Sequence, residues 1–148
     1  MMPTPDHSLH TRSALLAGLA LAGFAIASYL ALYQLQVLAT VWEPLFGNGS
    51  ELILHSSLAR SLPIPDAALG AVGYLIEVLC VGVRARSPGW VSAVYKSVVT
   101  IFALASVVLI ALQWSFFHAW CTLCLLSAAL SFVIAGIVMS ESSRSKVQ

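Results

Sequence analysis

Charged residues are scarce in this chain of 148 residues, because Asp, Glu, Lys and Arg together make up only 9% of it. Hydrophobic residues make up 59%, and the mean hydropathy is +0.92. A small soluble core could not bury so much apolar surface. The composition therefore excludes an ordinary soluble domain and predicts an integral membrane protein, with a single domain at this length.

Basic runs and metal-ligand clusters are also missing. The formal net charge is +1 and no stretch concentrates Lys or Arg, so nothing indicates a nucleic-acid partner. The chain has only three cysteines, and a zinc site needs four ligands, for which too few partners lie near the cysteines. No motif suggests a metal, a nucleotide or an internal repeat.

Two long stretches have no charge at all: residues 13–42, and the 44 residues between Lys96 and Glu141. A helix crosses a hydrocarbon core of about 30 Å with about 20 residues, so the second stretch must reverse once. The first apolar run exceeds the usual signal-peptide core of about 7 to 15 residues, so we expect a retained span. We predict an all-α, four-transmembrane-helix bundle with spans at 14–35, 66–83, 92–114 and 119–139, and a long outer loop at 36–65.

The predicted reversal places a cysteine pair at the start of the fourth span. Polar residues and tryptophans, which favour membrane interfaces, cluster at residues 113–120. Cys121 and Cys124 then lie in the first helical turn, on nearly the same face, where free N–H groups and the helix dipole favour a thiolate. This spacing suits a switchable disulfide. The alternative is that two small apolar residues simply fill space in an Ala/Leu-rich helix.

Positive charges are distributed unequally between the two ends of such a bundle. Six of the seven Lys and Arg residues fall on one side: Arg12, Arg84, Arg86, Lys96, Arg144 and Lys146. The positive-inside rule then predicts cytoplasmic termini, with the first loop and the cysteine pair facing outward, where disulfides are tolerated. Cys80 lies near the inner face, too far from the pair to bond with it, and is predicted to serve packing.

Glu77 lies inside the second predicted span, which makes it a functional candidate by default, because an unpaired charge at such depth is costly. Lys96 enters the third span from the same side of the membrane. We expect a structural ion pair between these two residues in preference to a proton path.

Several short motifs follow one another in a characteristic order and spacing. They are SYL at 28–30, LHSSLAR at 54–60, IP at 64–65, LGAVGY at 69–74 and WCTLCLLS at 120–127. Over most of its length the chain thus resembles the vitamin K epoxide reductase family in its short bacterial form. The resemblance implies a four-helix bundle around a quinone of ubiquinone or menaquinone type, in a bacterial inner membrane. The disulfide bond formation protein B family fits less well, because there the motif lies between the first two spans.

Residue roles follow from the same resemblance. It implies that Cys124 acts on the quinone and that Cys121 exchanges with an incoming disulfide or dithiol. Ser56 matches a small polar residue near the quinone head group, although a turn hydrogen bond explains it equally well. The remaining quinone-pocket candidates are Phe116, Phe117, His118 and Trp120. Interfacial anchoring is the alternative for the three aromatic residues, and an interfacial hydrogen bond is the alternative for His118.

One departure from the family pattern concerns the first outer loop. Family members carry a second cysteine pair there, which shuttles electrons from a thioredoxin-like protein. Here Ser50 stands at one position and residues 42–49 contain no cysteine. A thioredoxin-like partner could exchange directly with Cys121, a separate subunit could supply the shuttle cysteines, or the loop pair was replaced by design or lost with catalysis.

Two hypotheses therefore stay open. The first is a membrane thiol–disulfide oxidoreductase that passes electrons between protein thiols and a quinone through Cys121 and Cys124. The second is a non-catalytic membrane subunit or assembly factor that keeps the bundle without the full chemistry. The retained cysteine pair favours the first, and the absent loop pair favours the second.

Overall fold

The computed structural model describes residues 6–57, 61, 63–84 and 89–145, and all regular structure in this part of the chain is helical. The long helices are α1 (Asp6–Gln34), α4 (Asp66–Arg84), α5 (Gly89–Leu112) and α6 (Thr122–Ser145), and the short ones are α2 (Gly49–Leu54) and the π-helix η1 (Gln113–Phe117). The four long helices are long and apolar enough to cross a membrane. The prediction of an all-α membrane bundle with four transmembrane helices is confirmed.

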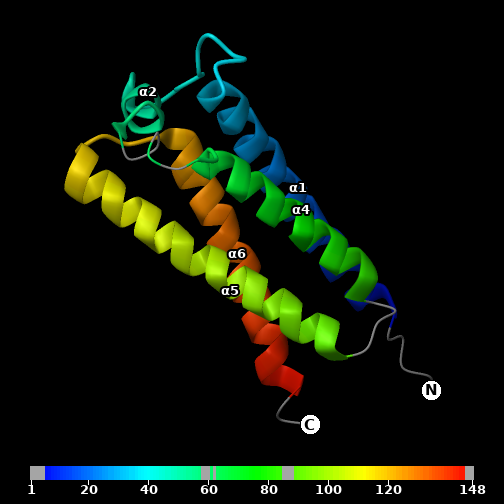
Figure 1. Ribbon diagram of the computed structural model, residues 1–148. Helices are drawn as coiled ribbons and strands as arrows, with labels where there is room; N and C mark the ends of the chain where they lie inside the picture. Colours follow the sequence, from blue (N-terminus) through cyan, green and yellow to red (C-terminus); the bar gives the residue numbers. More distant parts are fainter. Residues whose placement is uncertain (1–5, 58–60, 62, 85–88, 146–148) are drawn as a thin grey trace, which may run out of the picture.

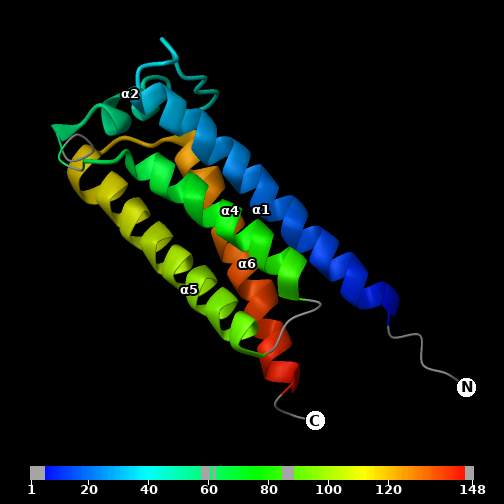
Figure 2. The ribbon, with the colours of Figure 1, turned by 45° about the vertical axis from the view of Figure 1, so that its right-hand side comes forward.

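The long helices run alternately up and down, so that the start of α1 and the end of α6 lie at the same end of the bundle (Figures 1 and 2). Helix α1 packs along α4, and α6 contacts both α1 and α5. Glycines allow close approach: a Cβ atom at Gly23 would overlap the ring of Tyr74, and one at Gly73 would overlap the ring of Phe102. Small residues at helix interfaces are typical of membrane proteins, where backbones must come close to gain dispersion energy.

Two helices extend six or more residues beyond the predicted spans. Helix α1 begins at Asp6, eight residues before the expected start at 14, and α6 continues to Ser145 instead of ending at 139. The apolar run determines which part of a helix can lie in hydrocarbon, but it does not determine where the helix ends. The polar flanks of both segments contain no helix breaker within these bounds, so the helical hydrogen bonding continues into them.

The long outer loop predicted at 36–65 is not evident in the segment between α1 and α4. That segment contains α2, which lies at the end of the bundle opposite the start of α1 (Figure 1). Gln34, the last residue of α1, donates to Asp66 Oδ1 at 2.5 Å and accepts the N–H of Ala67 at 3.2 Å. These bonds hold the end of α1 against the start of α4, so the segment leaves and returns at nearly the same place.

The chain reverses between α5 and α6, within the region where the polar and aromatic cluster predicted a turn. The last turn of α5 widens into η1, and His118 follows with φ +46°. A left-handed backbone is uncommon for a residue other than glycine, but histidine is among those that adopt it. This reversal places the first turn of α6 beside α2.

The buried side chains form two clusters along the bundle. The larger one joins all four long helices and includes Leu16, Tyr74, Tyr95 and Ile134. Inside it, the Tyr74 hydroxyl donates to the Ser127 carbonyl at 2.7 Å and lies 2.8 Å from Ser131 Oγ. The smaller cluster contains Leu30, Tyr33, Leu54, Cys121 and Leu123, and lies at the α2 end. The cysteine pair therefore belongs to a separate, smaller packing unit.

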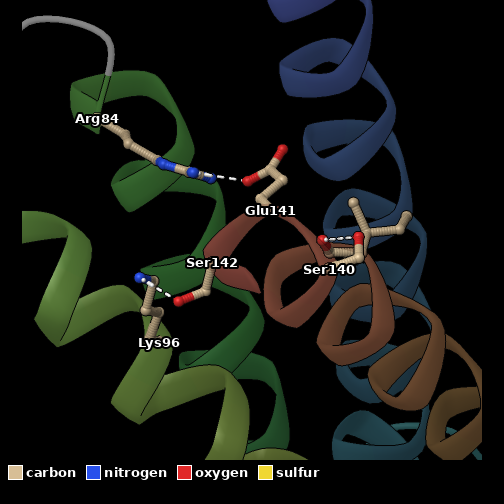
Figure 3. Close-up of polar contacts among 6 residues, drawn as sticks. Arg84, Lys96, Ser140, Glu141 and Ser142 are labelled. Atoms are coloured by element: carbon tan, nitrogen blue, oxygen red, sulfur yellow. Dashed lines mark hydrogen bonds and ion pairs between the residues drawn. The ribbon is translucent and has the colours of Figure 1, made fainter. Parts of the chain in front are cut away.

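The predicted ion pair between Glu77 and Lys96 is wrong. Lys96 donates to Ser142 Oγ at 3.0 Å, beside the 2.6 Å ion pair of Arg84 with Glu141 (Figure 3). Glu77 is 1% exposed, and neither carboxylate oxygen has a hydrogen-bond partner among the described residues. The lysine side chain is long enough to carry its ammonium group to the polar end of the bundle. There the group stays hydrated and avoids the cost of being desolvated beside a buried carboxylate.

The orientation of the bundle remains a prediction. Arg84 and Lys96 lie at the end of the bundle shared by the start of α1 and the end of α6. Arg60, Arg86 and Lys146 lie outside the described residues, as does the side chain of Arg144.

Tyr74→Phe tests the buried hydroxyl network. It removes a hydroxyl that bridges α4 and α6 but keeps the ring that fills the space at Gly23. We expect the free energy of unfolding to fall by about 1 kcal/mol, which is typical of a buried hydrogen bond. Reversible unfolding in mixed detergent micelles measures this. Leu79→Ala, at a side chain that is 60% exposed on the same helix, is the control and should have a smaller effect. Equal losses would show that the network contributes nothing specific.

Candidate thiol-disulfide site

Cys121 and Cys124 form a disulfide at the start of α6, with their Cα atoms 5.2 Å apart. The two residues differ in exposure, because Cys121 is 0% exposed and Cys124 is partly exposed. Cys80 is a free cysteine on α4. The pair therefore has one sulfur enclosed by protein and one beside the bundle surface.

The first turn of α6 has backbone N–H groups that no helical carbonyl accepts. Side chains satisfy them: Glu43 Oε1 accepts the N–H of Thr122 at 2.9 Å, and Cys121 Sγ accepts the N–H of Cys124 at 3.1 Å. Gln113 Oε1 lies 3.5 Å from the N–H of Cys121. When the disulfide opens, the N–H of Cys124 and the positive end of the α6 dipole can stabilise negative charge on the Cys121 sulfur.

Ser50 contacts the enclosed sulfur from the segment between α1 and α4, and Glu43 contacts Ser50. Ser50 is 0% exposed, and its hydroxyl lies 3.0 Å from Cys121 Sγ. The same hydroxyl is hydrogen-bonded to Glu43 Oε2. These two residues occupy the region in which a loop cysteine pair was expected and found missing.

Sequence reasoning identified Ser50 as a position without cysteine but not as a contact of the Cys121 sulfur, and it overlooked the role of Glu43. A usable signal was present, because Glu43 is the only charged residue between Arg12 and Glu51. A single carboxylate in such an apolar stretch needs a partner. The sequence did not show that this partner would be the first turn of a helix nearly 80 residues later.

Gly49 allows α2 to approach the start of α6. A Cβ atom at this position would overlap the backbone carbonyl of Trp120. Gly49 is buried, and the next residue is Ser50, so the absence of a side chain at 49 is what lets the hydroxyl at 50 reach the sulfur.

Two cavities are lined by sequence neighbours of the cysteine pair, although neither cysteine lines them. One of about 400 Å³ is almost wholly apolar and is lined by Ala25, Ile26, Tyr29, Trp42 and Leu123. Two of these lining residues are hydrogen-bonded, because the Tyr29 hydroxyl accepts the N–H of Trp42 at 3.0 Å. The second cavity, of about 280 Å³, lies between residues 46–52 and residues 118–120.

The structure brings only some of the predicted quinone-site residues together. His118 and Trp120 line the second cavity, and the Trp120 ring packs 6.4 Å from Phe46 and 5.7 Å from Trp114. Phe116 is 69% exposed, and Ser56 is half-buried just after α2; neither lines either cavity. The side chain of Phe117 lies outside the described part of the chain.

Gly49→Ala tests whether α2 packs directly against the start of α6. Because the new methyl group would overlap a backbone carbonyl, α2 must move away from α6 and take Ser50 away from the sulfur. After reduction, we expect Cys121 to react with a water-soluble maleimide about tenfold faster or more than in the unsubstituted protein, since thiol reactivity follows exposure. Gly18→Ala, where the methyl group meets nothing within 4 Å, is the control. Unchanged labelling in Gly49→Ala would contradict this close contact.

Comparison with known proteins places this site in a family. A search of curated proteins found no match to the chain. The sequence model described as the vitamin K epoxide reductase family matches residues 14–139, which are 126 of the 148 residues and include most of each long helix, Glu43, Ser50 and both cysteines. The chain therefore belongs to the vitamin K epoxide reductase family.

Proposed function

We propose that this membrane protein transfers electrons between protein thiols and a quinone through Cys121 and Cys124. Family membership indicates a membrane thiol–disulfide oxidoreductase, and proteins of this family are in general quinone-linked. The observation that carries the proposal is the Cys121–Cys124 disulfide at the start of a helix able to span a membrane, near an apolar cavity that Leu123 lines. A dithiol that opens and closes there can exchange electrons with a hydrophobic carrier.

The quinone ring fits the apolar cavity best. Its volume of about 400 Å³ is within the usual range for small-molecule sites, and its lining is aliphatic and aromatic. Leu123 lines it and lies between the two cysteines in the sequence, and Cys124, Ile26 and Tyr29 all pack against the smaller cluster. This supports Cys124 as the sulfur that acts on the quinone.

In this proposal, the quinone-pocket residues predicted from the sequence, where the structure describes their side chains, do not line the cavity that holds the ring. Trp120 and His118 would enclose the site from the second cavity, and the exposed Phe116 would contact the ring or tail during entry. Ser56 and Phe117 stay as predictions without a defined contact. Tyr29 and Trp42 are added as the polar and aromatic groups at the cavity wall.

The protein-thiol side of the reaction uses Cys121. A partner thiolate attacks one sulfur, the S–S bond breaks, and a second thiolate resolves the mixed disulfide, so that the partner is oxidised and the pair is reduced. Cys121 is enclosed by Ser50, so exchange at this sulfur requires α2 to move aside. The partner is a thioredoxin-like protein or a separate subunit that supplies the shuttle cysteines missing here.

Thiol trapping in isolated membranes tests the proposed function. The pair is reduced with a dithiol, the dithiol is removed, a soluble quinone analogue is added, and free thiols are alkylated and counted by gel shift. We expect quinone to restore the Cys121–Cys124 disulfide. Cys124→Ser should abolish this, and Cys80→Ser, at the free cysteine on α4, should leave it unchanged. If the thiols of the unsubstituted protein stay reduced after quinone is added, the result would instead support the non-catalytic subunit.

Glu77→Gln tests whether Glu77 takes part in the reaction at the cysteine pair. Glu77 is buried on α4 between Tyr74 and Val81, residues of the larger cluster, whereas the cysteine pair lies in the smaller one. We therefore expect quinone-driven reoxidation within about twofold of the unsubstituted rate, with stability unchanged or increased because an uncompensated carboxylate is removed. A folded variant that has lost reoxidation would assign Glu77 to the reaction.

A further inference from the structure

We propose that Ser50 and Glu43 form a proton relay that serves Cys121 when the disulfide closes and opens. The relay runs from Cys121 Sγ to the Ser50 hydroxyl at 3.0 Å, and from that hydroxyl to Glu43 Oε2. The inference rests on the proposed function and assigns two residues to its chemistry. Ser50 is a catalytic residue because it touches a reacting sulfur, and Glu43 is a positioning residue that acts through Ser50.

The hydrogen-bond inventory at Ser50 gives the relay its direction. A serine hydroxyl has one hydrogen to donate and lone pairs that accept. Both of its neighbours here, the carboxylate and the disulfide sulfur, can only accept, so the hydroxyl cannot satisfy both. The carboxylate is much the stronger acceptor and takes the hydrogen. The contact with Cys121 is then complementary to the reduced state, in which a thiol S–H donates to the Ser50 oxygen.

The Cys121 sulfur needs such a relay because it is buried. Cys121 and Ser50 are both 0% exposed, so solvent has no direct access to a proton on that sulfur. Glu43 is partly exposed and is followed by a run of exposed residues at 44–48. The carboxylate therefore connects a closed interior with the water at this end of the bundle.

Glu43 is also held in place from a second direction. Its Oε1 accepts the backbone N–H of Thr122 at 2.9 Å, which leaves Oε2 for Ser50. A helix cap alone would use the first contact only. The contact of Ser50 with the sulfur goes beyond what a cap requires, and it is what distinguishes the relay from simple capping.

The proton and electron balance of the step is complete with a quinone as oxidant. Two S–H bonds break and one S–S bond forms, so the pair loses two electrons and two protons. The quinone takes both electrons and, overall, two protons to become the quinol. The proton of Cys121 passes through Ser50 to Glu43 and from there to water. The reverse path supplies a proton to Cys121 after a partner dithiol has opened the disulfide and α2 has returned to its place beside α6.

Other titratable groups lie near this site and must be separated from Glu43. Glu51 is exposed on α2, Tyr29 accepts the N–H of Trp42, the His55 ring packs edge-on against Tyr33, and His118 lines the second cavity. Glu51→Gln is the matched control, because it removes the same charge one residue from Ser50 without touching the relay.

The test measures the rate of disulfide closure against pH in Glu43→Gln, Ser50→Ala and the double variant. Each reduced protein is oxidised once with a quinone analogue and once with diamide, a dithiol oxidant that needs no quinone site. We expect each single variant to close at least tenfold slower near pH 6, within the usual effect of a positioned base, and to recover by about tenfold per pH unit as hydroxide replaces it. The double variant should match the slower single variant, because the two residues act as one unit.

The outcomes distinguish this inference from the proposed function. Glu43→Gln and Ser50→Ala profiles parallel to that of Glu51→Gln, or additive losses in the double variant, would overturn the relay. A relay signature with diamide but no closure with quinone would support the relay and overturn quinone coupling. Glu43→Asp, which keeps the carboxylate, should restore part of the rate near pH 6, whereas a purely structural role would give no rescue that depends on pH.

Discussion

The contact between the Ser50 hydroxyl and the Cys121 sulfur is the constraint on which the site depends. It requires α2 to lie against the start of α6, which only a glycine at position 49 permits. It also requires Glu43 to reach the free N–H of Thr122. One polar contact thus connects the segment after α1 with the start of α6, and it encloses one of the two disulfide sulfurs.

The rest of the bundle supports this end of the molecule through two packing clusters. The larger cluster, with the Tyr74 hydroxyl network inside it, holds the four long helices together. The smaller cluster contains Cys121, with Cys124 packed against it, and Leu123 of this cluster also lines the apolar cavity. A membrane helix has no hydrophobic drive toward its neighbours, so close packing and these buried hydrogen bonds hold the helices together.

Charge patterning in the sequence was enough to predict the four helices and the reversal near residues 113–120, because hydrocarbon tolerates few charges and a span needs a fixed length. The polar and aromatic cluster also placed Cys124 in the first turn of the last helix, but Cys121 lies one residue before α6 begins at Thr122. Charge patterning could not predict that Glu43 would cap that turn, since the contact joins residues 79 positions apart. It also gave the wrong partner for Lys96, because sequence depth says nothing about which way a long side chain extends.

The most direct test of the account is a cross-link across the central contact. In a protein carrying Cys80→Ser and Cys124→Ser, Ser50→Cys places a second thiol where the hydroxyl now lies 3.0 Å from the Cys121 sulfur. Mild oxidation in membranes should join the two cysteines completely, whereas Ser57→Cys, at an exposed position beyond α2, should stay reduced. Free thiols at positions 50 and 121 after oxidation, or equal cross-linking from position 57, would contradict the arrangement of the site.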